Sequence, residues 1–172
     1  MTQTQNPAID APTDAQDRID AWLAEFQAAL SARDIQRAVG LFGVDGFWRD
    51  LVSFTWNITT SEGREQIAEM LHARLADTDP SGFRTSEPAV EDVADGVVTT
   101  SAFIEFETAV GRGVGHLRLR DGQGWTLLTA LTELRGYEEH RGATRVRGAV
   151  HGEDPDARSW AEKRADEQAA LG

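Results

Sequence analysis

The order of its hydrophobic periodicities constrains this chain more than any other feature. In the first half, apolar residues recur at the i, i+3, i+4 and i+7 spacing of helical stripes. The first stripe consists of Ile19, Trp22, Leu23, Phe26 and Leu30, the second of Ile35, Ala38, Val39 and Phe42, and the third of Ile67, Met70, Leu71 and Leu75. Residues 83–137 are strand-like instead. Helices followed by a run of strands is the order of an α+β domain.

Local signals refine the boundaries of these elements. Asp34 and Ser61 stand where the N-caps of the second and third helices are expected. Between those helices, residues 46–56 are rich in aromatic and β-branched side chains and end at Asn57. This composition predicts a strand that runs into a loop.

Strict alternation in residues 97–108 predicts a strand with one apolar face, formed by Val98, Ala102, Ile104 and Phe106. If Gly111 and Arg112 centre the following turn, Phe106 lies opposite Leu117 and Ile104 opposite Leu119. The same register places His116 beside Glu107, facing outward. A second turn at residues 121–124 leads into residues 125–134, which are apolar on both faces.

Together these elements predict an α+β cone, in which a curved antiparallel sheet wraps around three N-terminal helices in residues 17–136. Residues 1–16 are polar, contain Pro7 and Pro12, and are expected to form a flexible arm. Residues 137–172 are expected to form an extended linker and a terminal helix that begins at Asp154 and Pro155. A cone of this kind can enclose a pocket.

The composition argues against several classes of partner. A formal net charge of −12 repels phosphate backbones and anionic lipid headgroups, so we expect neither nucleic acid nor a membrane as partner. The chain has no cysteine and therefore no disulfide, thiolate ligand or thiol nucleophile. No apolar run approaches the roughly 20 residues that cross a bilayer, and a cytoplasmic protein is expected.

The sequence predicts no metal and no cofactor within this chain. Three of the four histidines are scattered without the spacing of metal ligands: His72, His140 and His151. Gly111, Gly113 and Gly115 precede a strand, whereas the glycines of a dinucleotide-binding fingerprint must open a helix.

Asp50 is the strongest chemical candidate. If its strand stays extended, Trp48, Asp50, Val52, Phe54 and Trp56 share one face. Aromatic neighbours would then desolvate the carboxylate and raise its pKa, as a general base requires. The alternative is a structural carboxylate at a strand end that accepts hydrogen bonds from nearby backbone amides.

Four short motifs, in this order, carry a family likeness: AAL at 28–30, AVGLF at 38–42, DGFWRD at 45–50 and EGREQI at 62–67. Their order resembles that of the nuclear transport factor 2-like superfamily, which includes ketosteroid isomerase and the SnoaL-type cyclases. By this resemblance, Asp50 falls where the isomerase keeps its proton-transferring aspartate. Phe26 and Gly115 fall on the two oxyanion donors, and neither can donate from its side chain. The resemblance therefore disfavours isomerase chemistry of that kind.

Longer stretches resemble the N-terminal, non-flavin domain of certain bacterial flavin-containing monooxygenase-like proteins. These stretches are FWRDLVSFTWN at 47–57, FETAVGRG at 106–113 and WTLL at 125–128. In those proteins a flavin-binding domain follows. The resemblance leaves open whether this chain is part of a longer flavoprotein or free-standing.

We therefore expect a small-molecule-binding or accessory domain that is not catalytic as this chain. A pocket for a small apolar ligand is predicted at Phe26, Trp48, Asp50, Phe54, Trp56 and Gly115. The outer sheet face, with Trp125, Leu127 and Leu131, is predicted to contact a second copy in a homodimer or a flavin-binding domain. One alternative is a cofactor-independent isomerase, dehydratase or hydrolase with Asp50 as general base, and another is a dimerisation module whose pocket is filled by side chains. For a binding domain, Asp50→Asn is expected to leave folding nearly intact.

Overall fold

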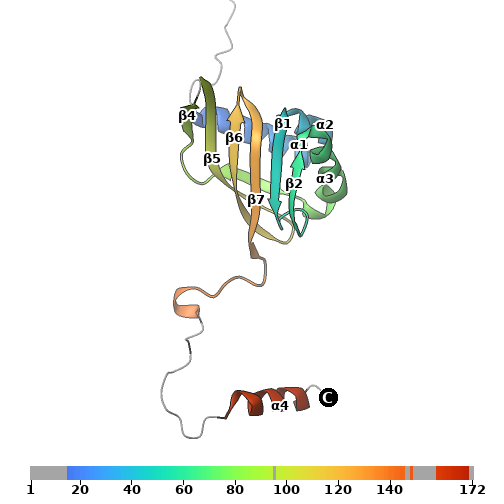
Figure 1. The fold of residues 1–172 in the computed structure, drawn as a ribbon, viewed down its shortest axis with the longest axis vertical. Coiled ribbons are helices and arrows are strands. Elements are labelled where there is room, and N and C mark those ends of the chain that lie inside the picture. Colours follow the sequence, from blue (N-terminus) through green and yellow to red (C-terminus); the bar gives the residue numbers. More distant parts are fainter. Residues whose placement is uncertain (1–14, 95, 146–147, 149–157, 171–172) are drawn as a thin grey trace, which may run out of the picture. The chain divides into compact units, whose positions relative to one another are not determined.

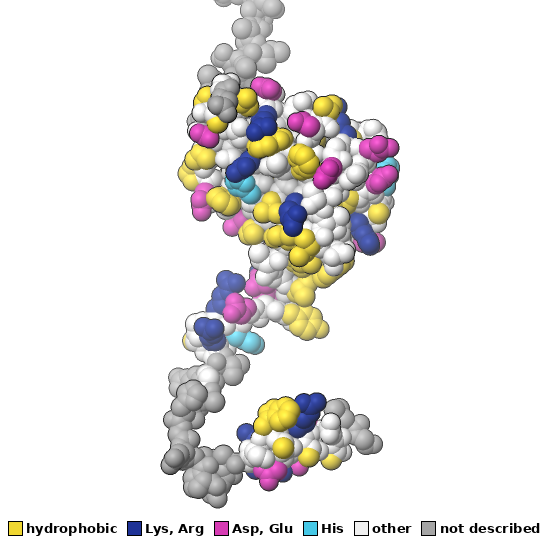
Figure 2. Space-filling view, viewed as in Figure 1, with side chains coloured by type: hydrophobic (Ala, Val, Ile, Leu, Met, Phe, Trp, Pro, Cys, Tyr) yellow, Lys and Arg dark blue, Asp and Glu magenta, His cyan; other side chains and the backbone are white. Residues whose placement is uncertain are grey.

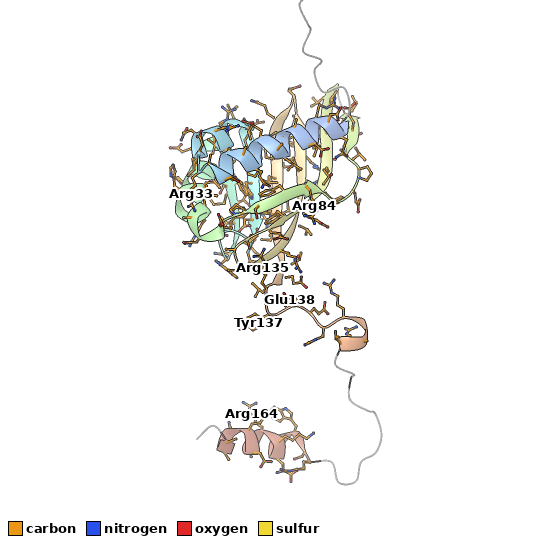
Figure 3. The ribbon with its side chains drawn as sticks, turned by 180° about the vertical axis from the view of Figure 1, so that it is seen from behind. Arg33, Arg84, Arg135, Tyr137, Glu138 and Arg164 are labelled. Carbon is orange, nitrogen blue, oxygen red and sulfur yellow. The ribbon has the colours of Figure 1, made fainter. Side chains whose placement is uncertain are left out.

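The computed structural model describes residues 15–94, 96–145, 148 and 158–170. The chain divides into two compact units, residues 1–138 and 139–172. The first unit contains helices α1 (Ala15–Ser31), α2 (Ile35–Gly40) and α3 (Gly63–Thr78). Its strands are β1 (Phe42–Leu51), β2 (Ile58–Glu62), β3 (Ser81–Thr85), β4 (Val90–Ala94), β5 (Val97–Glu107), β6 (Gly111–Arg120) and β7 (Gln123–Leu134). Helix α1 crosses one face of the sheet, as Figures 1 and 3 show from opposite sides.

The helices form where the apolar stripes predict them. The buried side of α1 consists of Ile19, Trp22, Leu23, Phe26, Ala29 and Leu30. Asp34 caps α2, and its side chain accepts the amide of Arg37 at 3.0 Å. The predicted cap Ser61 is instead a buried residue of β2, and α3 begins after Glu62. The Gln66 side chain accepts the Glu62 amide at 3.0 Å, which satisfies a backbone donor at the start of the helix.

The sheet has seven strands in the order β2-β1-β7-β6-β5-β3, with β4 also paired to β5. The β1–β7 pair is parallel and every other pair is antiparallel. The prediction of an entirely antiparallel sheet is therefore wrong at this one pair. The chain between β1 and β7 contains a helix and five strands, which is long enough for the crossover that a parallel pair needs. The α+β cone with a curved sheet around three helices is confirmed (Figure 1).

The β5–β6 hairpin has a different register from the predicted one. Phe106 lies opposite Gly113 and Ile104 opposite Gly115, a shift of four residues. The turn lies at residues 108–111, where the Thr108 amide donates to the Gly111 carbonyl at 2.9 Å. Because the shift is even, each residue keeps its predicted face. The glycines serve packing rather than the turn, since a Cβ at Gly113 would overlap the ring of Phe106.

The β6–β7 turn lies where it was predicted. Asp121 and Gly122 connect the paired residues Arg120 and Gln123, and their φ angles are 49° and 74°. Positive φ at both central residues is typical of the type I′ turn that suits a two-residue hairpin.

The second unit contains a short 3-10 turn (Gly142–Thr144) and α4 (Trp160–Ala170), whose residues are all exposed. Arg164, labelled in Figure 3, lies 5.0 Å from the ring centre of Trp160. The predicted start of this helix at residues 154–155 lies outside the described residues, as do residues 1–14 of the predicted arm. Helix α1 already includes Ala15 and Gln16. No helix in the described ranges is long and apolar enough to cross a membrane.

Candidate functional site

Asp50 lies at the end of β1, where its buried carboxylate accepts six hydrogen bonds. Oδ1 accepts from the Ser53 amide at 3.2 Å, from the Ser53 hydroxyl, and from the Thr129 hydroxyl at 2.9 Å. Oδ2 accepts from the amides of Phe54 at 3.0 Å and Thr55 at 2.8 Å, and from the Thr55 hydroxyl at 2.8 Å. An ionised carboxylate offers about four lone-pair sites. These donors therefore leave neither oxygen open to a substrate.

The same hydrogen bonds end the strand. Beyond Leu51 the chain turns, with φ angles of 60° at Val52 and 56° at Trp56. Phe54 is buried, whereas 59% of Trp56 is exposed. The expectation that alternate residues from Trp48 to Trp56 share one face is wrong, because the amides of this segment bind the Asp50 carboxylate instead of extending the sheet.

Five aromatic rings form a closed circuit inside the cone. The distances between ring centres are 5.6 Å for Phe26–Trp48, 4.8 Å for Trp48–Phe54, 6.1 Å for Phe54–Phe106, 5.2 Å for Phe106–Phe83 and 5.5 Å for Phe83–Phe26. These are distances of direct ring contact. At Gly115, the Ile104 side chain lies 3.0 Å from where a Cβ would stand. The structure thus brings Phe26, Trp48, Asp50 and Phe54 together, but they pack against one another.

Thr129 on β7 is a member of this interior that the sequence analysis missed. Its hydroxyl accepts from Nε1 of Trp48 at 2.9 Å and donates to Asp50 at 2.9 Å. Because β7 contains three threonines, the sequence alone did not single out Thr129. It connects the aromatic circuit to the carboxylate, so every polar atom of this group has a partner.

The hydrogen bonds of the fold thus satisfy the Asp50 carboxylate. A general base must reach the proton that it removes, and protein donors surround both Asp50 oxygens. A catalytic role for Asp50 stays a prediction. Within the described ranges, no group of three or more His, Cys, Asp or Glu residues could hold a metal ion.

A bulge at Trp125 changes the predicted faces of β7. Arg118 pairs with Thr126 and Leu119 with Gly124, so Trp125 is an extra residue between two ladder positions. One extra residue reverses the face of the residues that follow it, here as far as Leu131, where a second register shift begins.

Two of the three predicted interface residues consequently point inward. Leu127 lies opposite Leu117, and both are core residues. Leu131 also faces inward, since its paired position is Gly113 beneath the Phe106 ring. Only Trp125 lies on the outer face, where the Arg120 guanidinium stacks on its ring at 3.0 Å from the centre.

Three rows of side chains cross the outer face of strands β2, β1, β7 and β6 in register. The first row is Glu62, Phe47, Thr126 and Arg118, the second is Thr60, Arg49, Leu128 and His116, and the third is Ile58, Leu51, Ala130 and Val114. Phe103 on β5 extends the second row. Phe103 is 54% exposed and Val114 43% exposed. Figure 2, which views this face, shows apolar side chains interleaved with basic ones.

A hollow of about 290 Å³ lies within these rows. It is lined by Phe47, Arg49, Thr60, His116, Arg118, Thr126, Leu127 and Leu128. The predicted partner of His116 was Glu107, but its ring contacts Phe103 at 4.7 Å between centres. Burial of the imidazole, and then the charge of Arg118, lower the pKa of His116. Near neutral pH the arginines are therefore the charges of the hollow.

The fold is similar to those of solved structures with low sequence identity. One is a putative calcium/calmodulin dependent protein kinase II association domain from Xanthomonas campestris, with a TM-score of 0.53 and 17% identity over 77% of this chain and 97% of that one. Another is a ketosteroid isomerase-like protein from Erwinia carotovora atroseptica, with a TM-score of 0.53 and 12% identity over 70% and 98%. A putative aromatic ring hydroxylase from Novosphingobium aromaticivorans gives 0.51 and 15% over 71% and 92%.

No protein-family model matches the sequence, and the search of curated proteins found no match. At identities this low, the structural likeness concerns the fold alone. It confirms the predicted α+β cone with a curved sheet. The proposed likeness to the N-terminal domain of flavin-containing monooxygenase-like proteins stays a prediction.

Proposed function

We propose that this chain is a non-catalytic association domain, whose outer sheet face docks a second copy of the chain. The observation that carries the proposal is the contrast between the two faces of the sheet. The inner face is occupied by the aromatic circuit and by a carboxylate with no free oxygen. The outer face leaves Phe47, Val114 and Phe103 partly exposed around a hollow.

Exposed apolar side chains gathered on one face typically mark an interface. A sheet with one face against its own helices is expected to be polar on the other, whereas six of the twelve side chains in the three outer rows are apolar. Leu51, Leu128 and Ala130 occupy the central outer positions of β1 and β7. The structurally similar Xanthomonas protein, a putative calcium/calmodulin dependent protein kinase II association domain, supports a role of the same kind.

Two other hypotheses, a pocket for a small apolar ligand and contact with a flavin-binding domain, make different predictions. A small apolar ligand inside the cone would have to displace the ring contacts of Phe26, Trp48 and Phe54, so the interior favours the dimerisation alternative. In a longer flavoprotein, the same outer face would contact the flavin-binding domain, and this chain by itself would be monomeric.

Substitution of Val114 tests the proposal. Val114→Asp places a charge in the apolar third row of the outer face, where its desolvation opposes docking. We expect this variant to elute as a monomer from size-exclusion chromatography with light scattering at micromolar concentration, whereas the unmodified chain elutes as a dimer.

The matched control is Val93→Asp, because Val93 is 61% exposed and lies in β4 opposite Val98, away from the outer rows. The control should remain dimeric. If both variants keep the mass of the unmodified chain, the outer face is not the docking surface.

A further inference from the structure

We infer that Glu62 of each copy enters the hollow of the other copy and pairs with Arg118, around a two-fold axis that runs along the midline between β1 and β7. This inference rests on the proposed association of two copies. It goes further because it names the carboxylate that completes each hollow.

The outer face holds cations without carboxylate partners among the described residues. Elsewhere in the first unit, arginines pair with glutamates: Arg18 with Glu91, Arg37 with Glu25, Arg84 with Glu105, Arg112 with Glu133, and Arg135 with Glu107. Neither Arg49 nor Arg118 forms an ion pair with any carboxylate in the described ranges, and Arg49 donates only to the Thr60 hydroxyl, at 3.1 Å. In a chain with a formal charge of −12, two such arginines in one hollow favour an acidic partner.

Glu62 is the complementary group on the same face. The other outer-face glutamates, Glu105, Glu107 and Glu133, already pair with arginines. Glu62 pairs with no cation that the structure describes. Within one copy it cannot reach Arg118, because Phe47 and Thr126 lie between them in the row. Three strand spacings separate Glu62 from Arg118 by about 14 Å.

The positions of these residues fit a symmetric dimer. In an isologous interface each surface patch meets its own copy, so residue i contacts j and j contacts i. An axis parallel to the strands at the β1–β7 midline exchanges β1 with β7 and β2 with β6. In the first row this places Glu62 over Arg118 twice, with Phe47 over Thr126 between the two pairs.

The other rows agree with the same axis. In the third row it places Leu51 over Ala130 and Ile58 over Val114, so that apolar side chains meet. Packed sheets lie about 10 Å apart with nearly aligned strands. Long glutamate and arginine side chains from opposite sheets can meet across that distance.

Neighbouring axes give worse matches. An axis on β1 places Arg49 over Arg49, and an axis on β7 places Arg49 over His116 and leaves Glu62 without a cation. An axis between β7 and β6 places Leu51 over Glu105. The like charges of the two Arg49 side chains suppress the arrangement on β1, and an apolar side chain opposite Glu105 disfavours the arrangement between β7 and β6.

Charge exchange between copies tests the inference. In Glu62→Arg alone, the dimer would oppose two arginines at each pair, and in Arg118→Glu alone it would oppose two glutamates. We expect each single variant to dimerise at least about tenfold more weakly in sedimentation velocity. An equimolar mixture should restore dimers, because each pair then joins an acid and a base. The double variant should restore them as well.

The helical side of the cone supplies matched controls. Glu65→Arg on α3 and Arg33→Glu between α1 and α2 (Arg33 is labelled in Figure 3) make the same charge changes and should leave dimerisation unchanged. Thermal unfolding would verify that every variant folds. If the unmodified chain dimerises but the single variants do so equally well, or the mixture fails to restore dimers, the Glu62–Arg118 pairing is wrong while the proposed function stands. A monomeric unmodified chain would overturn both.

Discussion

At the scale of single residues, the hydrogen bonds of the Asp50 carboxylate hold several parts of the interior together. The carboxylate holds the amides of Ser53, Phe54 and Thr55 and the hydroxyl of Thr129. It therefore joins the end of β1, the following loop and β7. A buried acceptor with this many donors contributes to stability through bonds to an ionised group, which are stronger than neutral ones.

Replacement of Asp50 by asparagine should therefore destabilise the fold, contrary to the expectation from sequence alone. The amide NH₂ would face donors in place of an acceptor oxygen. We expect the free energy of unfolding to fall by about 3 kcal/mol, because buried donors are left unsatisfied. Urea denaturation followed by tryptophan fluorescence would measure the loss.

The control for this prediction is Asp77→Asn on the exposed side of α3, which should change the unfolding free energy by less than about 0.5 kcal/mol. Equal stability of the Asp50→Asn and Asp77→Asn variants would show that the carboxylate does not hold the loop.

At the scale of elements, glycines of β6 leave room for large side chains of β5 in the interior. Gly113 lies opposite Phe106, whose ring stacks on Phe83 at 5.2 Å and lies 6.1 Å from Phe54. The ring has no free direction in which to move. The glycine is therefore a packing requirement of the aromatic circuit.

Gly113→Ala should destabilise the protein by roughly 1–3 kcal/mol through overpacking. In a Phe106→Leu background, the same alanine should cost less, and thermal unfolding of the four proteins would measure the coupling. Gly40→Ala is the control, since no atom lies within 4 Å of its added Cβ. Identical costs of Gly113→Ala in both backgrounds would exclude a clash with the Phe106 ring.

The elements also separate what the sequence could predict from what it could not. The stripe with Trp22 and Phe26 was predictable because helical periodicity is local. The β5–β6 register was not, because Gly111 and Arg112 look like a turn while the glycines serve distant packing. The bulge at Trp125 could not be predicted either. It depends on the pairing of β7 with β6, and no local sequence signal marks the extra residue.

The candidate site divides in the same way. Asp50, Trp48 and Phe26 were predicted to lie together, and they do. Their chemistry could not be predicted, because it depends on a loop that folds back and on Thr129 from a strand far away in sequence. The hollow with Arg49 and Arg118 was missed for another reason, since the four strands that line it come together only after the parallel β1–β7 pair forms.

At the scale of the whole molecule, the cone has an interior packed with side chains, and we propose that its outer sheet face docks a second copy. Its helices and aromatic rings occupy the inner side of the sheet, and its outer rows combine apolar residues with arginines that pair with no described carboxylate. In this chain the outer face is the one that remains open.

Sedimentation equilibrium of the unmodified chain tests this account most directly. Over a range of micromolar concentrations, we predict a species of twice the chain mass that dissociates on dilution or in high salt, because ion pairs contribute to the contact. A single species with the mass of one chain across the whole range would contradict the account.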